Sequence, residues 1–275
     1  MRLHPFLDAP APLAFAHRGG ACDEPENTLP AFRHAVGLGY RCLETDVHLT
    51  RDGHIVAFHD DILDRVTDRR GAIGDLAVEE VRAADAGYSF TRDGGRTFPR
   101  RGHGIRVPLL TELLEEWPAA RVNLDAKSDA VVEPLADLLR RTGVLDRVCV
   151  GSFSDSRLRR IRAILGSSVC TSMGPRAVTV ARFAAWAGRM PRLGADCLQV
   201  PPRAGRVALV DRSLVRAAHR AGLLVHVWTI DEPAEMERLL DVGVDGLMTD
   251  RPEVLRDVLR RRHAWHAEGG GGAPS

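Results

Sequence analysis

The sequence predicts a (β/α)₈ barrel, an α/β fold in which eight parallel strands alternate with eight helices. Three observations support this: the length of 275 residues, a regular alternation of strand-like and helix-like segments, and polar residues near the ends of several predicted strands. Barrels of this class commonly form one domain of about 250 residues. A doubly wound sheet is the alternative, but it rarely needs eight units and gives no reason for so many polar strand residues.

The predicted elements follow one another in a regular order. Short apolar runs indicate strands, and apolar residues recurring every three or four positions indicate helices. Asn27 or Thr28 can cap a helix, Gly37 or Gly39 can end it, and Asp52-Gly53 predicts a hairpin turn. The predicted strands are 13–17, 41–49, 121–127, 147–153, 169–173, 195–201, 223–229 and 245–250, with a hairpin strand at 54–60. The predicted helices are 28–39, 77–86, 111–117, 131–143, 155–166, 175–188, 212–222, 234–243 and 252–262.

We expect a single domain over residues 1–265, interrupted by an insertion at 60–106. The insertion is charged and rich in glycine and arginine. Its Arg-rich part, residues 92–106, is interpreted as a solvated loop, with a lid over an anionic substrate as the alternative. The Gly-rich tail, residues 266–275, is expected to be disordered and to lie outside the fold.

Composition and charge exclude several classes of function. The chain has 38 Lys and Arg against 37 Asp and Glu, so no overall field favours binding to nucleic acid or an anionic membrane. No apolar run is long enough to span a membrane, and the N-terminal segment lacks the apolar core of a signal peptide. The five cysteines include no CxxC pair, and Cys149, Cys170 and Cys197 are expected to be buried free thiols. We therefore expect a cytoplasmic protein that acts on a small molecule.

Polar side chains interrupt the predicted strands near their C-terminal ends. Because side chains alternate along a strand, Glu44 and Asp46 share one face, and Asn123, Asp125 and Lys127 share another. The C-terminal ends of barrel strands form the mouth at which such folds place their active sites. Further polar or aromatic residues at predicted strand ends are His17, His59, Gln199, Trp228 and Asp250.

The carboxylates Glu44, Asp46 and Asp125 predict a cation at this mouth, because buried like charges are costly without a counter-ion. Oxygen ligands suit Mg²⁺, Ca²⁺ or Mn²⁺ rather than Zn²⁺. Salt bridges to arginines are the alternative for Glu44 and Asp46. Arg18 and Lys127 could neutralise a phosphate while nearby histidines move protons, so the set indicates phosphoryl chemistry.

Several neighbouring residues have a structural interpretation. Gly19 and Gly20 would let the backbone turn tightly and present His17 at the mouth. Glu26 either caps the following helix or orients the site. His226 should face the barrel interior, where a structural, hydrogen-bonded role is expected.

Five motifs carry a resemblance to a known family. The chain resembles glycerophosphodiester phosphodiesterases over residues 13–260, and the combined spacing is far more specific than HRG alone. The resemblance implies a TIM barrel with an insertion after the hairpin histidine. It also implies hydrolysis of glycerophosphodiesters to glycerol 3-phosphate and an alcohol, in phospholipid turnover. The motifs are HRGG (17–20), PENTL (25–29), LETDVHLTRDGHIVAFHDD (43–61), NLDAK (123–127) and VWT…GVDGLMTDRP (227–252).

The same resemblance implies residue roles. One divalent cation is implied, Mg²⁺ or Ca²⁺ with Mn²⁺ as a further candidate. The family usually has Glu where this chain has Asp125, which is shorter by about 1.5 Å and puts direct ligation in question. Which histidine is acid and which is base stays open. The implied roles are acid/base for His17 and His59, metal ligation for Glu44, Asp46 and Asp125, phosphate binding for Arg18 and Lys127, and pocket lining for Gln199 and Trp228.

Two other functions compete with this one. A phospholipase D-like enzyme would act on intact or lyso-phospholipids through a cyclic phosphate, and would favour exposed apolar residues at the mouth, which the sequence does not indicate. A non-catalytic binding protein with a decayed site is the third hypothesis. The complete set of His17, Arg18, Glu44, Asp46 and His59 argues against it. The head group and the oligomeric state are left open.

Overall fold

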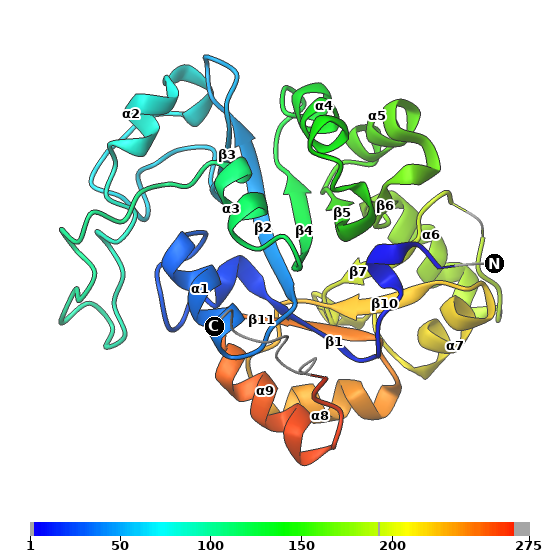
Figure 1. The fold of residues 1–275 in the computed structure, drawn as a ribbon. Coiled ribbons are helices and arrows are strands. Elements are labelled where there is room, and N and C mark those ends of the chain that lie inside the picture. Colours follow the sequence, from blue (N-terminus) through cyan, green and yellow to red (C-terminus); the bar gives the residue numbers. More distant parts are fainter. Residues whose placement is uncertain (1–2, 192, 267–275) are drawn as a thin grey trace, which may run out of the picture.

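The computed structural model describes residues 3–191 and 193–266 (Figure 1). Residues 267–275, nearly all of the predicted Gly-rich tail, lie outside the described residues. Eight parallel strands form one sheet in the order β6-β5-β4-β2-β1-β11-β10-β7. A single parallel bridge between Ser172 and Cys197 joins the two end strands, so the sheet is a nearly closed barrel and the predicted fold class is confirmed. The strands are β1 (Leu13–Ala16), β2 (Cys42–Leu49), β4 (Arg121–Ala126), β5 (Val148–Gly151), β6 (Cys170–Thr171), β7 (Cys197–Val200), β10 (Leu224–Val227) and β11 (Gly246–Thr249).

Each barrel strand is followed along the chain by a helix, as predicted, and the helices surround the barrel (Figure 1). The Thr28 hydroxyl accepts a hydrogen bond from the backbone N–H of Ala31 and caps the first helix. Gly143 ends α4 in the left-handed conformation. The helices are α1 (Leu29–Gly37), α3 (Leu110–Glu116), α4 (Val132–Thr142), α5 (Asp155–Leu165), α6 (Pro175–Trp186), α7 (Arg212–Arg220), α8 (Pro233–Val242) and α9 (Pro252–Arg261).

The insertion after β2 has its own small core. β3 (Ile55–Ala57) pairs antiparallel with β2 across the predicted turn, where Gly53 has a φ of 87°. The segment that follows carries α2 (Val78–Arg82) and extends beside β3, away from the barrel (Figure 1). The helix predicted at 77–86 is wrong in its length, because the N–H of Ala86 bonds to the carbonyl of Ile105 instead of continuing the helix. The insertion core contains Val56, Phe58, Leu63, Ile73, Val78, Val81, Ala84, Ala86, Ile105 and Val107.

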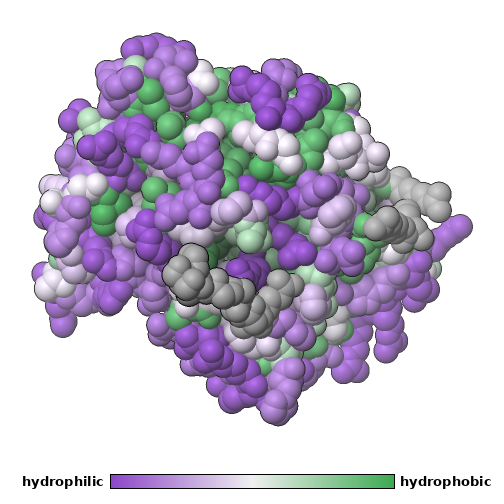
Figure 2. Space-filling view, in the orientation of Figure 1, coloured by the Kyte–Doolittle hydropathy of each residue, from purple (hydrophilic) through white to green (hydrophobic). Residues whose placement is uncertain are grey.

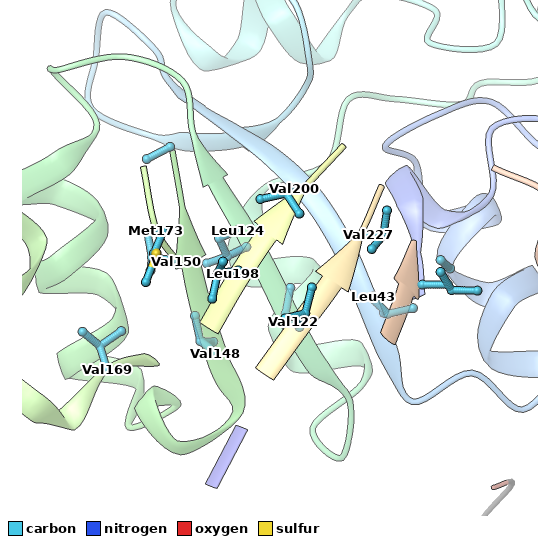
Figure 3. Packing of buried hydrophobic residues seen from close by; sticks show 14 of the residues in the cluster. Leu43, Val122, Leu124, Val148, Val150, Val169, Met173, Leu198, Val200 and Val227 are labelled. Carbon is cyan, nitrogen blue, oxygen red and sulfur yellow. The ribbon is translucent and has the colours of Figure 1, made fainter. Parts of the chain in front are cut away.

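Alternate residues of the strands belong to two different cores. Val122, Leu124, Leu198 and Val200 lie in the larger core, which the strands share with the surrounding helices (Figure 3). The residues between them point into the barrel. A smaller apolar cluster fills part of this interior, and a 3₁₀ turn at Pro5–Leu7 contributes two of its residues. The cluster contains Phe6, Leu7, Leu13, Phe15, Cys42, Cys149, Cys170, Cys197 and Met248.

The face of the molecule drawn in Figure 2 is largely polar. Figure 2 shows hydrophilic residues over much of the face seen there, with hydrophobic residues in patches between them. None of the helices in the described part of the chain has the length and apolar content that crossing a membrane requires. The structure also contains a small hairpin, β8 (Arg203–Ala204) and β9 (Val207–Ala208), between β7 and α7, which the sequence did not predict.

Candidate active site

A cavity of about 550 Å³ lies at the C-terminal ends of the barrel strands. The structure brings every site residue predicted from the sequence to its wall, although those residues come from six strands and the turns that follow them. Their chemical roles stay predictions. The residues are His17, Arg18, Glu44, Asp46, His59, Asp125, Lys127, Gln199 and Trp228.

A tight turn after β1 presents the first two of these residues. Arg18, Gly19 and Gly20 have positive φ angles of 49°, 82° and 98°. A Cβ on Gly19 would lie 2.7 Å from the Cβ of Ala31, and a Cβ on Gly20 would lie 2.7 Å from Cγ of Pro252. The two glycines therefore permit the turn that the sequence predicted, and they also permit the close approach of α1 and α9.

His17 lies between two carboxylates. Its Nδ1 atom is 2.7 Å from Oδ1 of Asp250, and its Nε2 atom is 3.8 Å from Oε2 of Glu44. Burial works against protonation of His17, but the charges of Glu44 and Asp250 outweigh it and raise the pKa to about 9. The imidazole therefore carries a proton at neutral pH. Asp250 had no predicted role; its only signal was a polar residue at the end of the last strand.

His59 is held by the residue that follows it. Its Nδ1 atom is 2.5 Å from Oδ1 of Asp60, and Nε of Arg65 donates to Oδ2 of Asp60 over 2.6 Å. Burial would raise the pKa of Asp60, but the hydrogen bonds from Arg65 and His59 hold it below its usual value. An ionised Asp60 favours the proton on Nδ1 of His59 and leaves Nε2 free to accept one. Asp60 was also missed, although it adjoins His59 in the sequence.

Glu44 is the carboxylate with the weakest cationic support. It is buried and accepts a hydrogen bond from the backbone N–H of Arg18 over 3.0 Å. Burial raises the pKa of Glu44 to about 7, although His17 opposes this effect. A buried carboxylate in this condition would be stabilised by a cation beside it.

Asp46 has three partners of its own. Nζ of Lys127 lies 2.7 Å from Oδ1, Nε of Arg18 lies 3.2 Å from Oδ2, and the Asn27 amide donates to Oδ2 over 3.0 Å. Burial would raise the pKa of Asp46, but Lys127 and Arg18 outweigh it and hold the pKa below its usual range. Asp46 is therefore ionised and already compensated.

Lys127 bridges two of the predicted metal ligands. Its Nζ atom lies 2.7 Å from an oxygen of Asp46 and 2.7 Å from an oxygen of Asp125. The carboxylate oxygens of the three predicted ligands do not all lie within 4.8 Å of one another. The three residues, all within the described part of the chain, are Glu44, Asp46 and Asp125. Carboxylate oxygens are suitable ligands for a hard divalent cation. A cation bound by all three carboxylates would have to displace the Lys127 ammonium from Asp46 or from Asp125.

A second group of contacts orients Arg18. Its Nη1 atom donates to Oε1 of Glu26 over 3.1 Å, and Arg65 binds the same carboxylate through both terminal nitrogens. Thr28 rather than Glu26 caps α1, so of the two interpretations of Glu26 the orienting one agrees with the contacts. Oδ1 of the Asn27 side chain accepts a hydrogen bond from the Thr45 hydroxyl over 2.7 Å, which fixes this loop to β2.

The far side of the cavity is apolar. Phe153, Phe183, Trp186 and Val207 line it and are 66%, 63%, 55% and 50% exposed. Phe153 packs edge-on against Trp228 with ring centroids 5.6 Å apart. The expectation that the mouth lacks exposed apolar residues is therefore wrong. In the sequence Phe183 and Trp186 fit the spacing of an ordinary amphipathic helix, and only the fold brings α6 and the β8–β9 hairpin to the mouth.

Two further expectations can be compared with the structure. His226 is completely buried, but neither ring nitrogen has a hydrogen-bond partner, so the expected hydrogen-bonded role is wrong. No residue of the Arg-rich segment 92–106 lines the cavity. Arg92 and Arg100 instead contact the backbone of Asp23 and the carboxylate of Glu24, so the segment packs beside the site rather than over it.

Comparisons with known proteins agree with the geometry. Residues 17–254 match the model of the "Glycerophosphoryl diester phosphodiesterase family". The chain is 39% identical over 267 residues to the Mycobacterium tuberculosis protein named "Probable glycerophosphodiester phosphodiesterase 2", covering 94% of this chain and 95% of that protein. It is also 30% identical over 275 residues to a lysophospholipase D of Homo sapiens, covering 89% of this chain and 85% of that protein.

Solved structures show the same architecture. A glycerophosphodiester phosphodiesterase from Agrobacterium tumefaciens is 25% identical with a TM-score of 0.71, covering 88% of this chain and 98% of that chain. An Oleispira antarctica phosphodiesterase, solved in complex with the product sn-glycerol-3-phosphate, is 25% identical with a TM-score of 0.73. That comparison covers 91% of this chain and 97% of the other.

Proposed function

Because this chain belongs to the glycerophosphoryl diester phosphodiesterase family and is a phosphodiester hydrolase, we propose that the barrel mouth is its active site. There it hydrolyses a glycerophosphodiester to glycerol 3-phosphate and an alcohol, in phospholipid turnover. One observation supports placing the hydrolytic activity at the barrel mouth. Two histidines, each bonded through Nδ1 to a carboxylate, share one cavity with Arg18 and Lys127.

The hydrogen-bond partners of the two histidines assign their roles in the proposal. His59 takes the proton of the attacking hydroxyl at Nε2, and that hydroxyl is the glycerol 2-hydroxyl or a water. The attacking oxygen bonds to phosphorus as the bond from phosphorus to the head-group oxygen breaks. His17, whose Nδ1 atom is hydrogen-bonded to Asp250, donates its proton to that leaving oxygen. Where the 2-hydroxyl attacks, a water then opens the cyclic phosphate.

We further propose that Glu44, Asp46 and Asp125 hold one divalent cation, Mg²⁺ or Ca²⁺ with Mn²⁺ as a further candidate. The raised pKa of Glu44, about 7, and the all-oxygen donor set support this. When bound, such a cation supplies charge stabilisation to the phosphate. Arg18 and Lys127 lie at the same wall and add fixed positive charge, although Lys127 must leave a carboxylate before it can bind phosphate.

The test is the release of glycerol 3-phosphate from a panel of glycerophosphodiesters, with Mg²⁺, Ca²⁺, Mn²⁺ or a chelator present. We expect His17→Gln and His59→Gln each to lower kcat by about 10²–10⁴-fold, the usual range for a general acid or base. His54→Gln is the matched control, because His54 lies at the exposed hairpin turn. Near-full activity in either site variant would contradict the pairing, and full activity in the chelator would contradict the cation.

The apolar wall supports a second candidate function. A lysophospholipid carries the same phosphodiester as a glycerophosphodiester, with one acyl chain on the glycerol. Phe183, Trp186 and Val207 offer that chain a surface continuous with the polar site. The human relative is named a lysophospholipase D, which agrees with such a substrate for that protein. We propose lysophospholipid hydrolysis, in the phospholipase D sense, as an additional activity of the same site.

Comparing kcat/KM for glycerophosphocholine and lysophosphatidylcholine tests this second activity. We expect Phe183→Ser to lower the value for the lysolipid about tenfold or more relative to the water-soluble substrate, because it removes a large apolar contact. Val180→Ser is the control: Val180 is 51% exposed on the same helix but does not line the cavity. An unchanged ratio in Phe183→Ser would exclude the apolar wall as an acyl-binding surface.

We also propose that the protein is cytoplasmic. None of the five cysteines forms a disulfide and four of them are buried, which agrees with a reducing compartment.

A further inference from the structure

Three cysteines on neighbouring strands meet inside the barrel. Cys149 of β5 lies opposite Cys170 of β6, and Cys197 begins β7, where the barrel closes. All three are buried, and their sulfur atoms lie within 4.8 Å of one another. The sulfurs of Cys149 and Cys197 are 4.0 Å apart. Nothing in the proposed phosphodiesterase mechanism uses these thiols.

His226 supplies a fourth candidate ligand. It lies on β10, which pairs with β7, and its side chain is completely buried. Neither ring nitrogen has a hydrogen-bond partner, which is rare for a buried polar side chain. The ring packs against Phe15, with centroids 5.0 Å apart, and close to Gly246, where a Cβ would lie 2.9 Å from Cδ2 of His226. Its ring nitrogens do not lie within 4.8 Å of all three sulfurs, so the ring must turn or shift toward them to complete the set of ligands.

The sulfur spacing fits a metal rather than a disulfide. A disulfide would need two sulfurs about 2.05 Å apart. A tetrahedral zinc ion, with Zn–S bonds of about 2.3 Å, holds its thiolates about 3.8 Å apart. The 4.0 Å between Cys149 and Cys197 is close to that value.

Gln199 makes a contact to one of the three sulfurs that resembles the hydrogen bonds to ligand sulfurs in metal sites. Nε2 of Gln199 lies 3.9 Å from the sulfur of Cys149 and donates to Oδ1 of Asn123 over 2.7 Å. An N–H directed at a ligand sulfur is a common second contact in metal sites. Gln199 and Asn123 also line the active-site cavity, so the cysteines lie directly beneath its floor.

We propose that Cys149, Cys170, Cys197 and His226 form a closed structural site for Zn²⁺, separate from the carboxylates at the mouth. The set of three thiolates and one imidazole is a standard zinc combination, and the lack of an open position excludes substrate. The thiols lose their protons when the ion binds, because the thiolate is the ligand. This inference is independent of the proposed phosphodiesterase activity.

The position explains what such an ion would do for the fold. β6 and β7 are joined by only one bridge, Ser172 to Cys197, at the seam that closes the barrel. An ion shared by β5, β6, β7 and β10 would fasten this seam from inside. It would also fix Gln199 from below, because Gln199 contacts Cys149.

Elemental analysis of the intact purified protein tests the proposal. Dialysis against a chelator should remove the cation from the carboxylates at the mouth. We expect about one zinc per chain to remain afterwards. The Asp46→Asn variant, which alters the carboxylate site, should retain that zinc. The Cys149→Ser/Cys170→Ser variant should lose it, whereas Cys42→Ser, at a buried cysteine that is not one of the proposed ligands, should keep it. Copper or iron in place of zinc would overturn the assignment.

Cobalt substitution makes the test independent of whether the cysteine variants fold. Wild-type protein refolded with Co²⁺ should show thiolate-to-cobalt charge-transfer absorption and the intense visible bands of a tetrahedral site. His226→Ala should change the visible bands while keeping the charge-transfer absorption. Folded wild-type protein with no retained zinc and no thiolate–cobalt band would overturn the proposal.

Discussion

His17 shows how residues distant in the sequence set the chemistry of one side chain. Asp250, at the end of the last strand, bonds to Nδ1, and Glu44 lies near Nε2. Burial alone would favour the neutral ring, but these two charges raise the pKa to about 9. The proton is therefore bound below pH 9 and lost above it. Any stability gained from the raised pKa is present below the unfolded value of about 6.5 and is lost as pH rises through 9.

Asp250→Asn tests this coupling. Removing the charge of Asp250 should lower the pKa of His17 toward its ordinary value, so the alkaline limb of the pH–kcat profile should move to lower pH. Measuring kcat from pH 5 to about 10 checks this against Asp137→Asn, an exposed aspartate on α4. If the alkaline limb stays in place, His17 is not the acid.

Lys127 is the only lysine in the chain; every other basic residue counted among the 38 is arginine. An arginine could supply the same charge, but not a compact ammonium with three donors. Lys127 uses that shape to bridge Asp46 and Asp125.

Lys127→Met separates the two interpretations of this residue. If Lys127 binds the phosphate, KM for glycerophosphocholine should rise about tenfold or more, because a charge-assisted contact is lost. At the same time the affinity for the divalent cation should increase, because the competing ammonium is gone. Titrating activity with both substrate and Mg²⁺ measures both effects. An unchanged KM would leave Lys127 only a structural counter-ion to the carboxylates.

At the scale of elements, the turn between β1 and α1 sets how far His17 and Arg18 lie from helix α1. Gly19 has a φ of 82°, and a Cβ there would also meet backbone atoms of α1 at 2.9 Å. Neither the turn nor the helix can move without displacing His17 and Arg18. The positive φ of Gly19 and its close contact with α1 therefore both constrain the position of the active-site residues.

Gly19→Ala should destabilise the protein by about 1–3 kcal/mol and lower kcat, because the residue is strained and the helix must shift. Gly37→Ala is the opposite case. Gly37 ends α1 with open space around it and should gain up to about 1 kcal/mol from reduced chain entropy. Urea denaturation of the two variants gives both values. Equal stability of the two variants would show that the turn is not constrained.

At the scale of the whole molecule, the barrel separates a structural end from a chemical end. The N-terminal 3₁₀ turn places Phe6 and Leu7, both almost fully buried, in one cluster with the interior cysteines. Charged residues gather at the opposite end, in the cavity. This arrangement keeps the thiols from solvent and leaves one open mouth for substrate.

Phe6→Ala tests this closure. The substitution should cost about 3–5 kcal/mol, because it leaves a large cavity next to the thiols. It should also speed the reaction of Cys149, Cys170 and Cys197 with a thiol reagent in the native protein. Phe90→Ala, in the half-buried part of the insertion, should cost less and leave those rates unchanged. Thiol rates that do not differ between the variants would show that the turn does not protect the cluster.

The sequence by itself determined the alternation of strands and helices, the turn glycines and the polar strand ends. Each depends on neighbours a few positions away: a period of two for Glu44 and Asp46, a cap at Thr28, a positive φ at Gly19. Because barrel strands end at one mouth, those local patterns also predicted that the site residues would meet, and all of them line one cavity.

Only the tertiary structure decided which charges compensate one another. Asp250 reaches His17 across 233 positions, Lys127 lies between two carboxylates, and α6 brings Phe183 to the mouth. It also brought three cysteines together inside the barrel and buried an unpartnered His226 on β10, which pairs with β7. Pairwise distances of a few ångströms control ionisation and ligation, and the closure of the barrel, rather than any local pattern, sets those distances.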